Sequence, residues 1–254
     1  MVVPAVFAVI MKKSDLKTGE IMNLPRISKR LEAAASLVRR GSRIADIGTD
    51  HAYLPIYLYV TGAVSGGVVS DINQGPVDRA RANLSDYACE NAFVAQKADG
   101  LCGVLQYGVD DIFILGMGGE LIANIIDKEP NIKNEKYRLI LQPMTHPEIL
   151  REYLFKNGFE IIAEKLVDED KIYQIILAVY TGKQTGADSF ELAFGKLNLA
   201  RRGDELTALL KRTKTVLGER VKGKAVSGAD DGYERYMLEK IDGFLEKEKD
   251  NDRS

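Results

Sequence analysis

The sequence has few of the residues that build disulfide frameworks, metal sites and overall charge. Its 254 residues include only two cysteines and two histidines, and the formal net charge is −2. Cys89 and Cys102 are too few for a disulfide framework and lack CxxC spacing, so we expect both to be buried and reduced. The small net charge excludes a strong overall attraction to nucleic acid or membrane, so that local charge decides the partner.

Long apolar runs are also missing. None approaches the ~20 residues needed to span a bilayer, and we expect a cytoplasmic protein with no membrane partner. The apolar start of the chain has neither a basic segment before it nor a small-residue cleavage site after it, which argues against a signal peptide. Met22 would be a more natural start. We therefore interpret residues 1–22 as an N-terminal extension, disordered and adding little to the fold.

Three common kinds of site lack their motifs. No GxSxG occurs and neither cysteine lies beside a histidine, which argues against a hydrolytic triad. Asp50 and His51 are adjacent, so their side chains diverge, and only His146 remains as a second imidazole; we expect no metal. A dinucleotide site needs three glycines in GxGxxG, whereas ADIGTDHAYLP at 45–55 has one glycine and two carboxylates.

Strand-like and helix-like segments alternate over most of the chain. We expect strands at 43–48, 66–72, 92–100, 111–119 and 137–143, and two more around a polar turn at 168–171. We expect helices at 27–38, 53–60, 76–91, 120–128 and 147–159. Continuous apolar strands separated by single helices indicate an α/β fold with a parallel sheet, to which the last hairpin adds an antiparallel strand. Seven such strands resemble the Rossmann-like fold of class I methyltransferases, and we assign residues 23–182 to this domain.

A second region follows a small and polar linker at 181–188. Apolar residues at helical spacing predict two helices, around 206–217 and 233–245, with a turn at 223–232. We expect residues 183–254 to form an antiparallel, coiled-coil-like helical hairpin. Nine Lys or Arg stand against three Asp or Glu in 195–225, a balance of +6. Such a stripe suits RNA phosphates, although a solvated helix face is the commoner meaning.

Acidic residues gather where the predicted strands end. In an open parallel sheet, ligands bind beyond the carboxyl ends of the strands. Asp46 and Asp50 follow the first strand, Asp71 ends the second, and Asp99 with Gly100 ends the third. Carboxylates would repel a diphosphate but suit a ligand with an amino group and a sulfonium cation, such as S-adenosylmethionine. Asp71 follows Asp46 by 25 residues, near the ~20-residue offset at which an acidic residue meets ribose hydroxyls, and Asp99 is placed for the adenine amino group.

Several blocks of the sequence together resemble one family. They are ISKRLEAAASLV, ADIGTDHAYLP, DINQGP, ADGL, ILGMGGELI, LILQP and IYQIILA, in this order from about Ile27 to Tyr180. They are similar to the bacterial tRNA (adenine-22-N1)-methyltransferases. The resemblance implies methyl transfer from S-adenosylmethionine to N1 of adenine 22 in tRNA, with S-adenosylhomocysteine as product. It also implies that the C-terminal hairpin engages tRNA.

The resemblance, the residues at the strand ends and the basic stripe give three sets of candidate residues. The cofactor-binding set is Arg30, Asp46, Gly48, Asp50, His51, Asp71, Ile72, Asp99, Gly100, Met117 and Gly118. The catalytic set is Asp50, Tyr53, Gly116 and Met117, and the tRNA-binding set is Arg201, Arg202, Lys211, Arg212 and Lys214. The chain departs from the family pattern at Thr49 (Ser in the family) and Asp71 (often Glu), which keeps the chemistry. At Met144 the family often has Asn, which leaves a role for that side chain open.

The glycines at 116–119 favour attack by a ring nitrogen. Enzymes that methylate the exocyclic amino group of adenine usually carry an (Asn/Asp)-Pro-Pro-aromatic block here, and this chain does not. The N1 lone pair attacks without a strong base, so the main tasks are alignment and desolvation. The product is cationic, and Asp50 is our candidate to stabilise it. Tyr53 or His51 would stack on the extruded base.

Plainer interpretations stay open for several of these residues. Asp50 or His51 could cap the helix that follows, His146 could only begin a helix, and Gly116–Gly119 could be only a tight turn. Two alternative functions stay open. One is a methyltransferase with another substrate, and the other is a non-catalytic RNA-binding protein with a vestigial cofactor site. The basic stripe disfavours the first and the acidic set disfavours the second. We expect a monomer or a weak homodimer.

Overall fold

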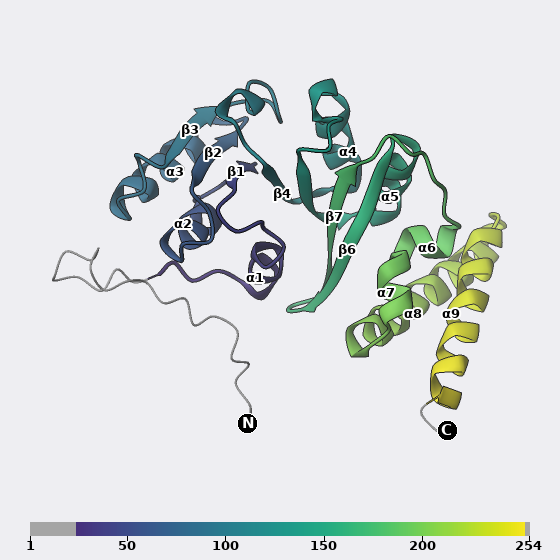
Figure 1. Cartoon of the computed structure of the whole chain (residues 1–254). Coiled ribbons are helices and arrows are strands. Elements are labelled where there is room, and N and C mark those ends of the chain that lie inside the picture. The colour runs from purple at the N-terminus through teal and green to yellow at the C-terminus, as the bar shows by residue number, and fades with distance from the viewer. Residues whose placement is uncertain (1–23, 252–254) are drawn as a thin grey trace. The chain divides into compact units, whose positions relative to one another are not determined.

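The computed structural model describes residues 24–251, with side chains to residue 247, so the predicted extension at 1–22 lies outside the described residues. The chain divides into two compact units, and the boundary falls between Ile114 and Leu115. The strands of the described region form one seven-stranded sheet in the order β3-β2-β1-β4-β5-β7-β6 (Figure 1). The predicted seven-stranded α/β fold is confirmed.

The first unit holds the parallel strands that carry the acidic residues. β1 pairs in parallel with β2 and with β4, and β2 pairs in parallel with β3. These strands are β1 (Arg43–Ile47), β2 (Gly66–Asp71), β3 (Phe93–Lys97) and the start of β4 (Asp111–Gly118). The helices are α1 (Lys29–Ala35), α2 (Tyr53–Val60) and α3 (Gln74–Asp86), with a short 3-10 helix at Leu105–Tyr107. β1, β2 and the start of β4 are almost wholly buried, as expected for a parallel sheet with both faces covered.

A charged contact joins the segment after α1 to the start of β4. Asp111 is fully buried, and its carboxylate accepts from Arg39 Nε at 2.7 Å and from the Arg39 backbone N–H at 2.6 Å. Arg39 Nη2 also donates to the Asp110 carbonyl at 2.8 Å. Hydrogen bonds on both carboxylate oxygens offset the cost of burying Asp111.

The second unit begins with the last part of β4 and ends with the C-terminal helices. Its strands are β5 (Arg138–Thr145), β6 (Phe159–Asp168) and β7 (Ile172–Tyr180). β7 runs antiparallel to both β5 and β6, which confirms the predicted terminal hairpin. The helices are α4 (Gly119–Asp127), α5 (Pro147–Lys156), α6 (Ser189–Phe194), α7 (Lys196–Arg201), α8 (Asp204–Ser227) and α9 (Gly232–Asn251), with a 3-10 helix at Pro130–Ile132.

Helices α8 and α9 form the predicted hairpin and lie side by side (Figure 1). Their shared core also includes two phenylalanines of α6; it consists of Phe190, Phe194, Leu206, Leu210, Leu217, Met237 and Ile241. The predicted turn at 223–232 is too long, because α8 continues through Gly223 to Ser227. A glycine inside a helix costs only about 1 kcal/mol and is tolerated. The helix ends instead at Gly228, whose φ of +69° is the usual left-handed termination.

Two expectations drawn from composition can be compared with the structure. Cys89 and Cys102 are both free, but only Cys89 is buried. The expectation of burial is wrong for Cys102, which lies in an exposed turn after β3 rather than in a regular element. Among residues 24–251, no helix is long and apolar enough to cross a membrane.

Candidate functional site

The loop after β1 turns sharply beside β2. Gly48 has a φ of +76°, and the backbone N–H groups of Gly48 and Thr49 both donate to the Ser70 carbonyl, at 2.8 and 2.9 Å. Thr49 Oγ1 accepts from the N–H of Ala52, the residue before α2, at 3.1 Å. The hydroxyl of Thr49 therefore organises the start of α2. The interpretation of Asp50 or His51 as the helix cap is wrong, because their side chains are engaged elsewhere.

Asp46 is a buried residue near the carboxyl end of β1. Its relative exposure is 8%. Burial raises the pKa of Asp46 from 3.8 to about 6, and a hydrogen bond with the Thr49 side chain opposes the rise. Desolvation therefore decides the outcome. Near neutral pH this carboxylate is an anion in a poorly solvated place, and a cationic group of a ligand would relieve that cost.

Asp50 lies at the surface between two basic side chains. Its Oδ1 accepts from Arg79 Nη2 of α3, and its Oδ2 lies 3.2 Å from His51 Nε2. The hydrogen bond from Arg79 holds the pKa of Asp50 below its usual value, with a further contribution from His51. The His51 and Tyr53 rings are stacked, with centroids 5.2 Å apart and planes 11° apart. Asp50 is thus already compensated by a cation, and a flat aromatic pair lies next to it.

Asp71 is the last residue of β2, and Asp99 comes two residues after β3. One Asp71 carboxylate oxygen accepts from the Asn73 N–H at 2.7 Å, and the Asp71 carbonyl accepts from the Ala98 N–H at 3.0 Å. Asp99 is exposed and precedes Gly100, which has a φ of +58°. Because β1, β2 and β3 are adjacent and parallel, the structure brings Asp46, Asp71 and Asp99 to one edge of the first unit's sheet.

Two further cofactor candidates lie in the first unit. Ile72 follows Asp71 and is 56% exposed. Arg30 is half-buried on α1. Their roles stay predictions.

The second unit contains the glycine segment. β4 runs through Gly118 and α4 begins at Gly119, so there is no separate glycine loop in this described segment. A Cβ on Gly118 would lie 3.2 Å from Thr145 Oγ1, and one on Gly119 would overlap the His146 carbonyl. The two glycines therefore allow a close approach between the junction of β4 with α4 and the end of β5, at Thr145 and His146. Gly116 is exposed with a φ of +79°, and Met117 is half-buried.

His146 lies at the start of helix α5, as the plainer interpretation of this residue predicts. It is the residue before α5, has a φ of +52°, and its Nδ1 lies 3.0 Å from Glu148 Oε1. A non-glycine residue with positive φ is uncommon. Its imidazole is exposed at the carboxyl end of β5.

The five predicted tRNA-binding side chains are all exposed, but they differ in their partners. Arg212 lies 3.8 Å from Asp168, and Lys214 is paired with Asp242. Arg201 donates to the Asn198 side-chain oxygen at 2.9 Å, and the Arg202 guanidinium lies 5.4 Å from the centre of the Phe244 ring. Among the described side chains, no carboxylate pairs with Arg201, Arg202 or Lys211.

The residue that sequence reasoning missed in the first unit is Arg79. It lies 29 positions after Asp50, and nothing in the local sequence indicates the pairing. The candidate cofactor-binding groups are mainly carboxylates and glycine backbone. They fit a cationic, hydroxyl-bearing organic ligand such as S-adenosylmethionine.

In the part of the chain that the structure describes, no cluster of three or more His, Cys, Asp and Glu could hold a metal ion.

Replacing Asp46 with Asn should remove part of the pH dependence of stability. The folded chain holds the Asp46 proton more tightly than the unfolded chain, with pKa values of about 6 and 3.8. Its stabilising contribution is therefore full below pH 3.8 and is lost as the pH rises through 6. The loss is on the order of 3 kcal/mol. Urea unfolding across this range should show a flatter profile for Asp46→Asn than for the wild type.

Asp86→Asn is the matched control, since Asp86 is an exposed carboxylate at the end of α3 in the same unit. It should keep the wild-type profile. A wild-type profile in Asp46→Asn as well would contradict the assignment.

Comparisons with known proteins give the chain its family. The family described as methyltransferase domain matches residues 27–176. The tRNA (adenine(22)-N(1))-methyltransferase of Bacillus subtilis (strain 168) is 35% identical over 177 residues, 69% of this chain and 74% of that protein. Streptococcus pneumoniae Sp1610 in complex with S-adenosyl-L-methionine has a TM-score of 0.78 and 29% identity, covering 87% of this chain and 100% of that chain. The B. subtilis m1A22 tRNA methyltransferase TrmK has a TM-score of 0.74 and 28% identity, covering 88% and 97%. The chain belongs to the tRNA (adenine(22)-N(1))-methyltransferase family.

Proposed function

We propose that this chain transfers a methyl group from S-adenosylmethionine to N1 of adenine 22 in tRNA. The observation that carries the proposal is the acidic edge formed by Asp46, Asp71 and Asp99 at the ends of three adjacent strands, in a chain of this family. The same fold binds S-adenosyl-L-methionine in Sp1610. We expect the protein to act in the cytoplasm as a monomer or a weak homodimer.

The first unit supplies most of the proposed cofactor contacts. Asp71 would accept from the ribose hydroxyls, Asp99 from the adenine amino group, and Asp46 would face the amino end of the cofactor. Arg30 is proposed for its carboxylate. S-adenosylmethionine supplies the electrophilic methyl group on its sulfonium sulfur. The task of the protein is to bind and orient the two reactants and to exclude water.

Asp50 and the aromatic pair are proposed to receive the target adenine. Its N1 lone pair would form a bond to the methyl carbon while the bond from that carbon to the sulfonium sulfur breaks. S-adenosylhomocysteine would leave, and the positive charge would pass to the adenine. Asp50 can stabilise that charge by exchanging its contact with Arg79 for one with the adenine. The stacked rings of His51 and Tyr53 offer a flat surface to an extruded base. Gly116, Met117 and Gly118 are proposed to lie near the methyl group, where glycine permits close approach.

The tRNA is proposed to bind along the C-terminal helices. Residues 23–182 then form the catalytic domain and residues 183–254 the tRNA-engaging region. Phosphate contacts draw most on basic side chains that have no carboxylate partner of their own. Within the described side chains these are Arg201, Arg202 and Lys211 rather than Arg212 and Lys214.

The reaction can be tested with unmodified tRNA transcripts that carry either adenine or guanine at position 22. After incubation with S-adenosylmethionine, nuclease digestion and mass spectrometry should detect 1-methyladenosine at position 22 of the adenine transcript alone. Cofactor binding with no methyl transfer to any transcript would favour the non-catalytic alternative. Methylation of another position, or of a small molecule only, would contradict the proposed substrate.

Lys211→Ala should weaken tRNA binding more than Lys214→Ala. Lys211 is exposed and lacks a carboxylate partner among the described residues, whereas Lys214 is paired with Asp242 and already partly neutralised. In binding titrations at several salt concentrations, Lys211→Ala should lower the slope of log K against log salt by about 1. Affinity for S-adenosylmethionine should not change. Equal effects of the two substitutions, or a loss of cofactor affinity, would contradict this assignment.

A further inference from the structure

The interior of the second unit holds an ion pair that the reaction does not use. Arg151 of α5 and Glu164 of β6 are each only 1% exposed at the side chain, and Arg151 Nη2 lies 2.7 Å from Glu164 Oε1. Burial lowers the pKa of Arg151, and Glu164 opposes this. Apolar residues of similar volume often give equal or greater stability than such a pair. A geometric role is therefore a better reason for the pair than stability.

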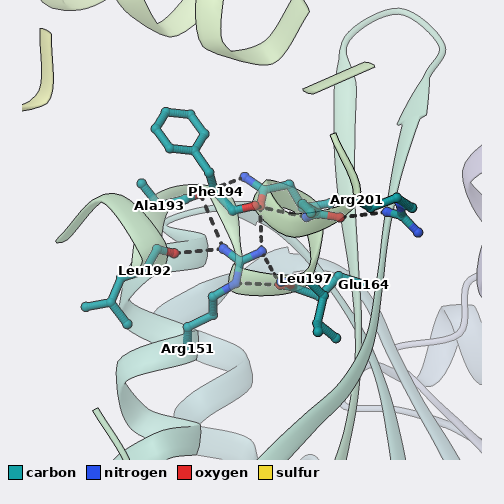
Figure 2. A network of polar contacts seen from close by, with 9 residues as sticks. Arg151, Glu164, Leu192, Ala193, Phe194, Leu197 and Arg201 are labelled. Atoms are coloured by element: carbon teal, nitrogen blue, oxygen red, sulfur yellow. Dashed lines mark hydrogen bonds and ion pairs between the residues drawn. The ribbon is translucent and has the colours of Figure 1, made fainter. Parts of the chain in front are cut away.

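Arg151 uses its donors on three elements (Figure 2). Nε donates to Glu164 Oε1 at 2.8 Å, and Nη2 donates to Gln174 Oε1 of β7 at 2.7 Å. Nη1 donates to the Leu192 and Ala193 carbonyls of α6, at 2.8 and 3.3 Å. The guanidinium thus holds the carbonyl end of α6, where helix carbonyls need partners, against the sheet.

Glu164 holds the next helix. Its Oε2 accepts from the backbone N–H of Leu197, in the first turn of α7, at 3.0 Å. Gly195 connects α6 to α7 with a φ of +88°, and a Cβ there would overlap both carboxylate oxygens of Glu164. The ion pair therefore fixes the corner between α6 and α7 from both sides, and only glycine fits at the corner.

A second group of polar contacts lies at the same corner and includes Phe194 and Arg201 (Figure 2). Asn198 is buried, and its Nδ2 donates to the Phe194 carbonyl at 2.9 Å. Its Oδ1 accepts from Nη2 of Arg201 at 2.9 Å. Arg201 is exposed at the end of α7, just before α8 begins at Asp204. The ion pair holds Leu192, Ala193 and Leu197, and Asn198 joins the neighbouring Phe194 to Arg201, a basic side chain proposed to bind tRNA.

We propose that Arg151 and Glu164 are positioning residues for tRNA: they fix the α6–α7 corner and so set the direction in which Arg201 and the hairpin α8–α9 meet the RNA. This inference rests on the proposed function. Phosphate contacts spread along a rigid surface bind well only if their spacing matches the backbone of the RNA. The pair acts through the helices and does not touch substrate.

The double variant Arg151→Met/Glu164→Leu tests this, because it replaces the pair without leaving one charge unpaired. The Kd and KM for tRNA should rise about tenfold or more, as expected when binding groups are misplaced. The kcat at saturating tRNA and the Kd for S-adenosylmethionine should stay within about twofold of wild type, since the change acts on positioning. Arg151→Lys keeps the charge but loses the guanidinium fork. Its Kd for tRNA should therefore lie between those of the wild type and of the double variant.

Arg39→Met/Asp111→Leu is the matched control. It removes the ion pair between Arg39 and the buried Asp111 in the first unit, and its Kd for tRNA should equal that of the wild type. Should the Arg151/Glu164 variant fail to fold, Asn198→Leu removes the side-chain contacts to the Phe194 carbonyl and to Arg201, and should raise the Kd for tRNA about threefold.

The inference is overturned if the folded Arg151/Glu164 variant binds tRNA as tightly as wild type. It is also overturned if affinity for tRNA and for S-adenosylmethionine fall together, which would mark a merely structural role. Because the binding measurement does not require turnover, a wild-type chain that binds tRNA without methylating it would reject the proposed function and leave the positioning role to be judged on binding. A wild-type chain that binds no tRNA would reject both.

Discussion

The contact between Arg151 and Glu164 holds the first two C-terminal helices against the sheet of the second unit. It joins α5 and two strands of the sheet to the first helices of the C-terminal region, and it does so with directional hydrogen bonds rather than with apolar area. Apolar packing alone, such as that of Phe190 and Phe194 against α8 and α9, tolerates small rotations. A buried guanidinium and carboxylate tolerate them poorly, because any lost hydrogen bond leaves a desolvated charge. The direction of the basic helices is thereby set.

In the first unit, neighbouring carboxylates have different environments and therefore different properties. Asp46 is buried, so its pKa is raised, whereas Asp50 at the surface is stabilised as an anion by Arg79. Asp71 spends one oxygen on the turn into α3. At one edge of the sheet, Asp46 is therefore a poorly solvated anion, Asp50 is paired with a cation, and Asp71 already accepts one backbone hydrogen bond. A ligand with hydroxyl, amino and sulfonium groups can use each of them differently.

Much of this could be predicted from the sequence, and the failures share a cause. Most of the parallel strands were predictable because they are largely apolar runs between turn residues, and the acidic edge followed from the rule that the carboxyl ends of parallel strands meet. Helices α6 and α7 were missed because six residues are too few to show a helical period. The partners of Asp50 and Arg151 were missed because Arg79 and Glu164 lie far along the chain, where only the topology brings them close.

Amide hydrogen exchange on the full chain tests most directly whether the buried ion pair fixes the corner between α6 and α7. The Arg151→Met/Glu164→Leu variant should exchange its amides at 195–201 faster than the wild type, because the Leu197 N–H loses its carboxylate acceptor and Gly195 is no longer held. The apolar core around Leu210 should keep its protection in both proteins. Equal exchange at 195–201 in the two proteins would contradict the account.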